Sequence, residues 1–89
     1  MFLHLGSDFL VNIKDIVGIF DLDQTTLSEK TKSFLKDSEK TGIVISVDND
    51  LPKSFVIATV YDETRVYLSS LSCSVLKKRA EDSLSLAKV

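Results

Sequence analysis

Residues 54–69 read SFVIATVYDETRVYLS. Two runs rich in β-branched and aromatic residues, Ser54–Tyr61 and Arg65–Ser69, flank the polar residues 62–64. This arrangement is typical of two strands joined by a hairpin loop. The longest dense apolar run, Phe55–Tyr61, has the length of a strand and is far short of the roughly 20 apolar residues that cross a bilayer as a helix. The stretch therefore predicts an antiparallel β-hairpin.

Further strands are predicted at the N-terminal end of the chain. FLHL (2–5) and FLVN (9–12) are short apolar runs separated by the turn-forming residues GSD (6–8), which predict a bend or a hairpin. IVGIF (16–20) has no polar alternation and therefore predicts a strand buried on both faces. A glycine inside a strand indicates a bulge or a close backbone approach, which we expect at Gly18.

After residue 25 the spacing of the apolar residues changes to that of a helix. Thr26-Leu27-Ser28-Glu29 matches the capping box, in which the Thr hydroxyl accepts the backbone N–H three residues on and the Glu reaches back. We therefore expect a helix to start at Thr26 and to end before Gly42, which can adopt positive φ as the residue after the helix. The face predicted to be buried comprises Leu27, Thr31, Phe34, Leu35 and Ser38.

The remaining elements complete an α+β fold. Ile43–Val47 predicts another strand, and the loop DNDLP (48–52) ends it because the proline removes its neighbour from helical geometry. A last helix is predicted to start at Ser70 or Ser72, and residues 81–89 are expected to fray. The order β-β-β-α-β-β-β-α predicts one small domain over residues 1–89, with a mostly antiparallel sheet of about five to six short strands and two helices.

Charge and length limit the kinds of function. The 89 residues contain 11 Lys or Arg and 13 Asp or Glu, for a net charge of −2, and the pI is about 5.2. A free-standing basic domain that binds nucleic acid usually has a pI above about 9, so a DNA-binding role must depend on local patches or on assembly. Chains this short bury a modest share of their surface, which favours a homo-oligomer. The acidic excess lies in residues 1–50.

No group of residues in the sequence indicates catalysis. His4 is the one histidine, and no nearby nucleophile is present for it to activate, so we expect a non-catalytic protein. The single Cys73 has no partner for a disulfide or a metal, which predicts a buried or half-buried structural thiol. Asp48 and Asp50 do not extend into a calcium loop and are expected to form local Asx-type hydrogen bonds. We therefore expect neither a metal nor a cofactor.

The N-terminal sequence gives an expectation of location. MFLHLGSDFLV (1–11) has no basic region and no long apolar core, unlike a secretory signal peptide. No stretch approaches the length of a membrane span. We expect a cytoplasmic protein that has no membrane partner.

Three segments together carry a resemblance to a known family. They are residues 1–26 (MFLHLGSDFLVNIKDIVGIFDLDQTT), 39–58 (EKTGIVISVDNDLPKSFVIA) and 65–79 (RVYLSSLSCSVLKKR). Over about residues 1–80 the chain resembles the bacterial extracellular-matrix (biofilm) regulator family, the RemB-type members more than the RemA-type. The resemblance implies a regulator of biofilm-matrix gene expression, because RemA-type relatives are DNA-binding transcriptional regulators that form ring-like homo-oligomers.

The resemblance also implies candidate DNA-binding residues. Lys14 corresponds to one basic site of the DNA-binding relatives, and their arginine-rich turn corresponds to residues 48–53, where only Lys53 keeps a positive charge. Lys is a weaker bidentate phosphate ligand than Arg. Lys77, Lys78 and Arg79 form the one dense basic run, which is a weaker candidate because such runs commonly serve solubility and the helix dipole.

Two functions therefore remain open after the sequence is read. The first is a DNA-binding homo-oligomer that regulates matrix genes, in which weak contacts add through multivalency. The second is a non-catalytic oligomeric interaction module that has lost direct DNA binding and acts through an unknown protein partner. The acidic turn favours the second, because phosphate binding depends on cationic side chains that release counterions.

Overall fold

The computed structural model describes residues 1–22 and 28–87, with side chains through residue 83. Its elements confirm the predicted α+β order. They are β1 (Phe2–Gly6), β2 (Phe9–Asn12), the 3₁₀ turn η1 (Ile13–Asp15), β3 (Ile16–Asp21), α1 (Glu29–Thr41), β4 (Val44–Ser46), β5 (Ser54–Val60), β6 (Glu63–Ser69) and α2 (Cys73–Ala87). Strands β1 and β2 form a separate hairpin, and the other four form a sheet of order β3-β5-β6-β4. All pairings in it are antiparallel except β4 with β6.

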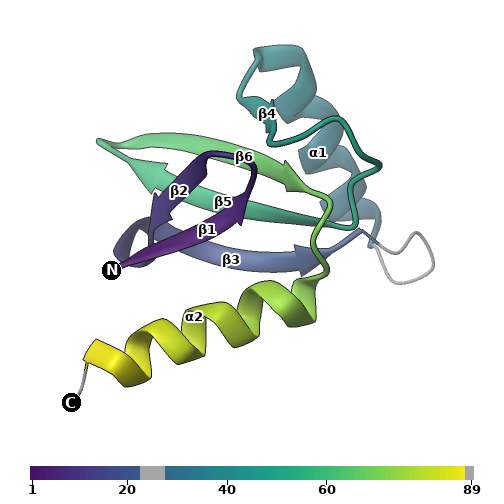
Figure 1. Cartoon of the computed structure of the whole chain (residues 1–89). Helices are drawn as coiled ribbons and strands as arrows, with labels where there is room; N and C mark the ends of the chain where they lie inside the picture. The colour runs from purple at the N-terminus through teal and green to yellow at the C-terminus, as the bar shows by residue number, and fades with distance from the viewer. Residues whose placement is uncertain (23–27, 88–89) are drawn as a thin grey trace.

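The elements form layers around the four-stranded sheet. The β1–β2 hairpin crosses one face of the sheet, α1 lies on the opposite face, and α2 runs alongside β1 and β3 (Figure 1). The buried core lies between the hairpin, the sheet and α2. Its fully buried or nearly buried members are Leu3, Leu5, Val11, Val47, Val56, Ala58, Tyr67 and Leu76. No helix in the described part of the chain is long and apolar enough to cross a membrane.

The β5–β6 hairpin is the longest ladder of the fold, and its turn differs from the prediction. The register pairs Val60 with Glu63, so the loop is two residues, Tyr61 and Asp62, and not residues 62–64. Both loop residues have positive φ, 50° and 65°, as in the type I′ turns that match the twist of paired strands. The predicted loop was wrong because an aromatic residue is typical of a strand, whereas the pairing of the strands places Tyr61 in the turn.

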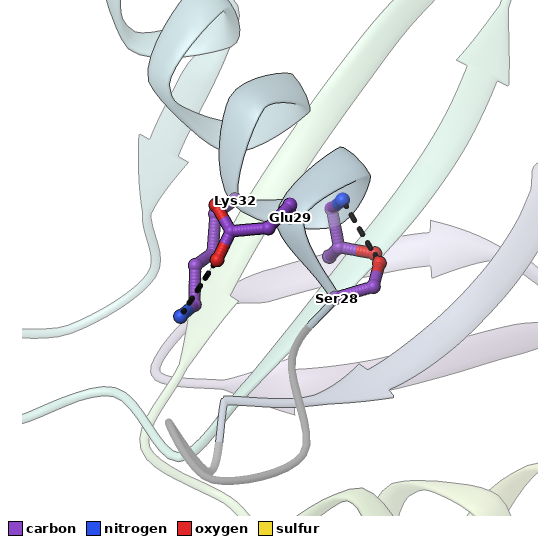
Figure 2. A network of polar contacts seen from close by, with 4 residues as sticks. Ser28, Glu29 and Lys32 are labelled. Atoms are coloured by element: carbon purple, nitrogen blue, oxygen red, sulfur yellow. Dashed lines mark hydrogen bonds and ion pairs between the residues drawn. The ribbon is translucent and has the colours of Figure 1, made fainter.

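Helix α1 begins later than predicted. The N-cap residue is Ser28, whose Oγ accepts the backbone N–H of Thr31 at 3.2 Å, and Glu29 in the first turn pairs with Lys32 at 3.7 Å (Figure 2). The predicted cap, Thr26, lies outside the described residues, as does Leu27. Ser28 has extended geometry, with φ −73° and ψ 161°, so α1 begins at the residue that follows it.

The end of α1 and its buried face agree better with the sequence pattern. Gly42 is left-handed at φ 77° and its N–H bonds the carbonyls of the last turn, as predicted. Ser38 is buried, and Thr31 and Leu35 are half-buried. Phe34 is 36% exposed, so the helix covers the sheet only partly.

Strand β3 is not buried on both faces, contrary to the prediction. Val17 is 66% exposed and Phe20 is 41% exposed. The reason is topological: β3 is at the edge of the sheet, and continuous apolar character does not distinguish an edge strand from a central one. The irregularity predicted at Gly18 is confirmed, since the register with β5 shifts between Ile16 and Gly18.

Helix α2 covers strand edges that would otherwise be open. It starts after Ser72, whose Oγ accepts the N–H of Val75 at 3.2 Å, one of the two predicted caps. The half-buried Cys73 thiol donates to the carbonyl of Ile19 in β3 at 3.6 Å, which agrees with a structural thiol. Because the helix occupies this edge, β3 is shielded there from pairing with another chain.

Candidate nucleic-acid interface

Lys14 lies in η1, the short turn between β2 and β3. The turn is held locally, because the backbone N–H of Lys14 donates to Asn12 Oδ1 at 3.1 Å. Asn12 is the N-cap of the turn. The Lys14 side chain is exposed, so a fixed backbone presents a cation to solvent at the start of β3.

Lys53 directly precedes β5 and is held by two neighbouring segments. Its N–H donates to the carbonyl of Ser69 at 2.8 Å, and its carbonyl accepts the N–H of Leu22 at 3.0 Å. Its side chain is exposed. Neither Lys14 nor Lys53 forms an ion pair with a carboxylate within residues 1–22 and 28–83.

The two lysines lie at opposite ends of the β3–β5 ladder. Ile16, which follows η1 after Asp15, pairs with Ala58, whereas Asp21 pairs with Ser54, the residue after Lys53. Five residue steps along β3, or four along β5, at about 3.3 Å each separate these pairs by roughly 13–17 Å. A single subunit therefore does not bring Lys14 and Lys53 together, and two different phosphates are needed to engage both.

One carboxylate of the acidic turn next to Lys53 has a structural role. Asp48 Oδ2 accepts the Ser70 hydroxyl at 2.6 Å, and Oδ1 accepts the backbone N–H of Asp50 at 3.1 Å. The Ser70 hydrogen bond is the main reason that the pKa of Asp48 lies below its ordinary value. The expected Asx-type bond is thus confirmed for Asp48, and the ionised carboxylate ties the turn to the segment that follows β6.

The basic run of α2 is divided among different tasks. Lys78 lies 4.0 Å from Asp82, and Arg79 Nη1 donates to the carbonyl of His4 in β1 at 3.3 Å. Lys77 is exposed and has no ion pair within residues 1–22 and 28–83. Arg79 therefore bridges α2 and the hairpin, and the three basic residues have different surroundings. In the described residues no group of three or more potential ligands gathers for a metal.

Sequence patterns did not reveal the exposed apolar side chains. An apolar run predicts a strand without showing which of its members face solvent. The most exposed are Phe2 at 60%, Leu10 at 61%, Val17 at 66%, Leu51 at 87% and Tyr61 at 96%. Only their burial in the folded chain distinguishes them from the core residues beside them.

The comparison with known proteins gives the class of this protein. The RemA-like family, described as "Extracellular matrix regulatory protein A-like", matches residues 2–80. The chain belongs to this family, which confirms the resemblance seen in its three sequence segments. It is 46% identical over 81 residues, 91% of each chain, to "Extracellular matrix regulatory protein B" of Bacillus subtilis (strain 168).

Proposed function

We propose that this protein is a cytoplasmic, non-catalytic regulator of extracellular-matrix gene expression that binds DNA directly as a homo-oligomer. The observation that carries the proposal is the presentation of Lys14 and Lys53: both side chains are exposed on backbone that hydrogen bonds hold in place. The printed name of the relative, an extracellular matrix regulatory protein, supports the regulatory role.

Assembly is a necessary part of this proposal. One subunit offers two lysines roughly 13–17 Å apart along the ladder and has a net charge of −2. Repetition of the pair in an oligomer multiplies weak phosphate contacts through effective concentration. The exposed apolar side chains of β1, β2 and β3 supply surface that association would remove from water.

A salt series with purified protein and duplex DNA tests the proposal. The log of the affinity should fall linearly with the log of the salt concentration, with a slope of about −0.9 for each phosphate neutralised. The double variant Lys14→Ala/Lys53→Ala should weaken binding to unrelated sequences alike and make the slope shallower by about two for each subunit bound.

A matched control separates these two residues from charge in general. Lys30→Ala/Lys40→Ala removes the same two charges from exposed positions of α1, and it should leave both affinity and slope nearly unchanged. Equal losses in the two double variants would refute the assignment of Lys14 and Lys53. No binding by the wild type at low salt would refute direct DNA binding.

The second candidate is an oligomeric interaction module that acts through a protein partner without touching DNA. The turn at residues 48–53 favours it, since the Asp48 carboxylate lies fixed close in sequence to Lys53. An oligomer that shows no DNA binding at low salt would support this candidate and exclude the first.

A further inference from the structure

The two outer strands of the four-stranded sheet, β3 and β4, differ in their protection from other chains. An unprotected outer strand offers a row of unpaired N–H and C=O groups to which another strand can bind. In β3 the register is irregular, and α2 lies along the strand with its Cys73 thiol bonded to the carbonyl of Ile19. In contrast, β4 pairs only with β6 among the described strands, and residues 41–47 include no charged residue and no proline. The open edge of this sheet is therefore at β4.

The outward-facing backbone groups of β4 belong to Val44 and Ser46. The carbonyl of Ile43 and the N–H of Val47 both form hydrogen bonds with β6, each at 3.0 Å. Successive residues of a strand direct their N–H and C=O groups to opposite sides, so the groups of Ile45 also face β6. Those of Val44 and Ser46 face away from the sheet, and no backbone hydrogen bond between described residues uses them.

A notch of about 450 Å³ adjoins this edge and leaves room beside β4. It exists because β6 extends past the start of β4: Val44 pairs with Val66, so residues 63–65 have no neighbour in β4. The two charged residues of the lining are paired with each other at 3.8 Å. The lining comprises Gly42, Ile43, Ile45, Glu63, Thr64 and Arg65.

An apolar row crosses the sheet and ends at the open edge. The register places Ile19 opposite Val56 and Val56 opposite Tyr67. Tyr67 in turn lies opposite Ile45 of β4. Val56 and Tyr67 belong to the buried core, and Ile19 and Ile45 pack against it. Because register partners lie on one face of a sheet, the row stops at Ile45 where the strands end.

We propose that β4 pairs antiparallel with β4 of a second copy, about a two-fold axis that passes beside Ile45. Val44 of each copy then lies opposite Ser46 of the other, and each of these two pairs exchanges two backbone hydrogen bonds. Every outward group of both strands is satisfied, whereas a register shifted by two residues would leave those of Val44 or of Ser46 without a strand partner. This inference rests on the homo-oligomer of the proposed function and names a surface that forms it.

The same register joins the apolar rows of the two copies. Ile45 faces Ile45 of the second copy as a non-hydrogen-bonded pair, the arrangement in which cross-strand side chains lie closest. Because β4 is three residues long, a second β4 matches the edge in length, in backbone pattern and in its central apolar side chain. Such a two-fold contact closes at the dimer, and a larger assembly requires a further interface.

Charge does not drive this contact. Antiparallel pairing brings the end of α1 in each copy towards the loop that follows β4 in the other. Carboxylates outnumber cations there, so backbone hydrogen bonds and apolar contact must supply the association, and added salt should strengthen it by screening. The charged side chains that flank β4 along the chain and in the notch are Glu39, Lys40, Asp48, Asp50, Glu63 and Arg65.

A proline variant tests the proposal by sedimentation velocity. Ser46→Pro removes an outward N–H and leaves the bonds from β4 to β6 intact, as proline is tolerated on outer strands whose N–H faces solvent. Each two-fold contact loses two hydrogen bonds, so the dissociation constant of the assembly should rise by about tenfold or more. The control Ser46→Ala keeps the N–H and should assemble like the wild type. Unchanged far-ultraviolet circular dichroism verifies folding, and a folded Ser46→Pro variant that assembles like the control would overturn the proposal.

Disulfide cross-linking measures the register directly. In a Cys73→Ser background, Ile45→Cys places two thiols opposite each other across the axis. The Cα atoms of such a non-hydrogen-bonded pair lie about 4.5 Å apart, within the roughly 4.4–6.8 Å that a disulfide spans. Oxidised glutathione should therefore produce a covalent dimer of twice the 9.9 kDa subunit mass. Ser46→Cys in the same background is the control, because its two thiols are offset diagonally by about 8 Å and should cross-link far less.

The outcomes separate this contact from the proposed function. Equal cross-linking of Ile45→Cys and Ser46→Cys, or none by Ile45→Cys, would overturn the β4 contact and leave the homo-oligomer standing if the wild type still assembles. A wild type that is monomeric at tens of micromolar would overturn both the contact and the homo-oligomer. DNA binding is decided separately by the salt series, in which affinity for DNA should fall as salt rises, whereas assembly through β4 should not weaken.

Discussion

Replacement of Ser69 by alanine should destabilise the fold more than removal of the Ser28 hydroxyl that caps α1. Ser69 is 0% exposed, and its Oγ donates to the carbonyl of Leu5 at 2.7 Å and accepts the N–H of Leu71 at 3.1 Å. Leu5 lies at the irregularity between His4 and Gly6, where it has no register partner in β2. One buried hydroxyl thus joins the β1–β2 hairpin to the main sheet.

The expected magnitude follows from the two partners that the substitution leaves unsatisfied. The buried Leu5 carbonyl should cost about 1–3 kcal/mol, and the Leu71 N–H, which is partly accessible to water, about 0.5–1 kcal/mol. The free energy of unfolding should therefore fall by about 1.5–4 kcal/mol. For a chain of this length, this corresponds to a fall in Tm of roughly 6–32 °C.

Urea unfolding followed by circular dichroism measures this loss. Wild type and variant are compared at one protein concentration, because the apparent stability of the proposed homo-oligomer depends on concentration. Ser46→Ala, at an exposed position of β4, is the control and should change stability by less than about 0.5 kcal/mol. A Ser69→Ala variant that is as stable as this control would refute the reasoning that the hydroxyl joins the two sheets.

Three further predictions concern the ends of α1 and the acidic turn. Ser28→Ala should lower the free energy of unfolding by about 1 kcal/mol in urea titrations, because the Thr31 N–H loses its cap. The control is Ser33→Ala, at an exposed position inside the helix. Equal changes in the two variants would contradict a capping role for Ser28. Gly42→Ala should lower the free energy of unfolding by about 1–2 kcal/mol in the same assay because φ is 77°, which is unfavourable for a residue with a Cβ, although open space surrounds the position. An unchanged free energy of unfolding would contradict this strain. The pKa of Asp48 is lowered in the folded state, so its contribution to stability is complete above the ordinary pKa of about 4 and is lost as the pH falls through the lowered value. Stability measured from pH 6 to pH 2 should therefore fall less steeply in Asp48→Asn than in the wild type, and identical profiles would exclude this role.

Local sequence determined the kinds of element and their order. The caps at Ser72 and Gly42 depend on residues within one helical turn, and the irregularity in β3 adjoins Gly18. Apolar runs likewise specify strands through their own composition. Because these signals lie within a few residues of the feature they encode, the order β-β-β-α-β-β-β-α could be predicted from the sequence, and the family could be recognised.

The tertiary structure alone decided where the strands lie and what the exposed residues can do. Burial of β3 was mispredicted because the sequence does not show that this strand forms an edge. The separation of Lys14 from Lys53 follows from the β3–β5 register, and the bridge from Arg79 to His4 spans 75 positions of the chain. Such features depend on partners distant in sequence, so no local pattern encodes them.

The fold shows which of the acidic and basic side chains are available to a DNA partner. By sequence alone, the net charge of −2 and the DNDLP turn argue against DNA. In the structure, the Asp48 carboxylate is engaged with Ser70, whereas Lys14 and Lys53 are exposed. The sequence sets the number of charged side chains. Folding determines which of them form hydrogen bonds and which face solvent, because their partners come from positions that only the tertiary structure brings together.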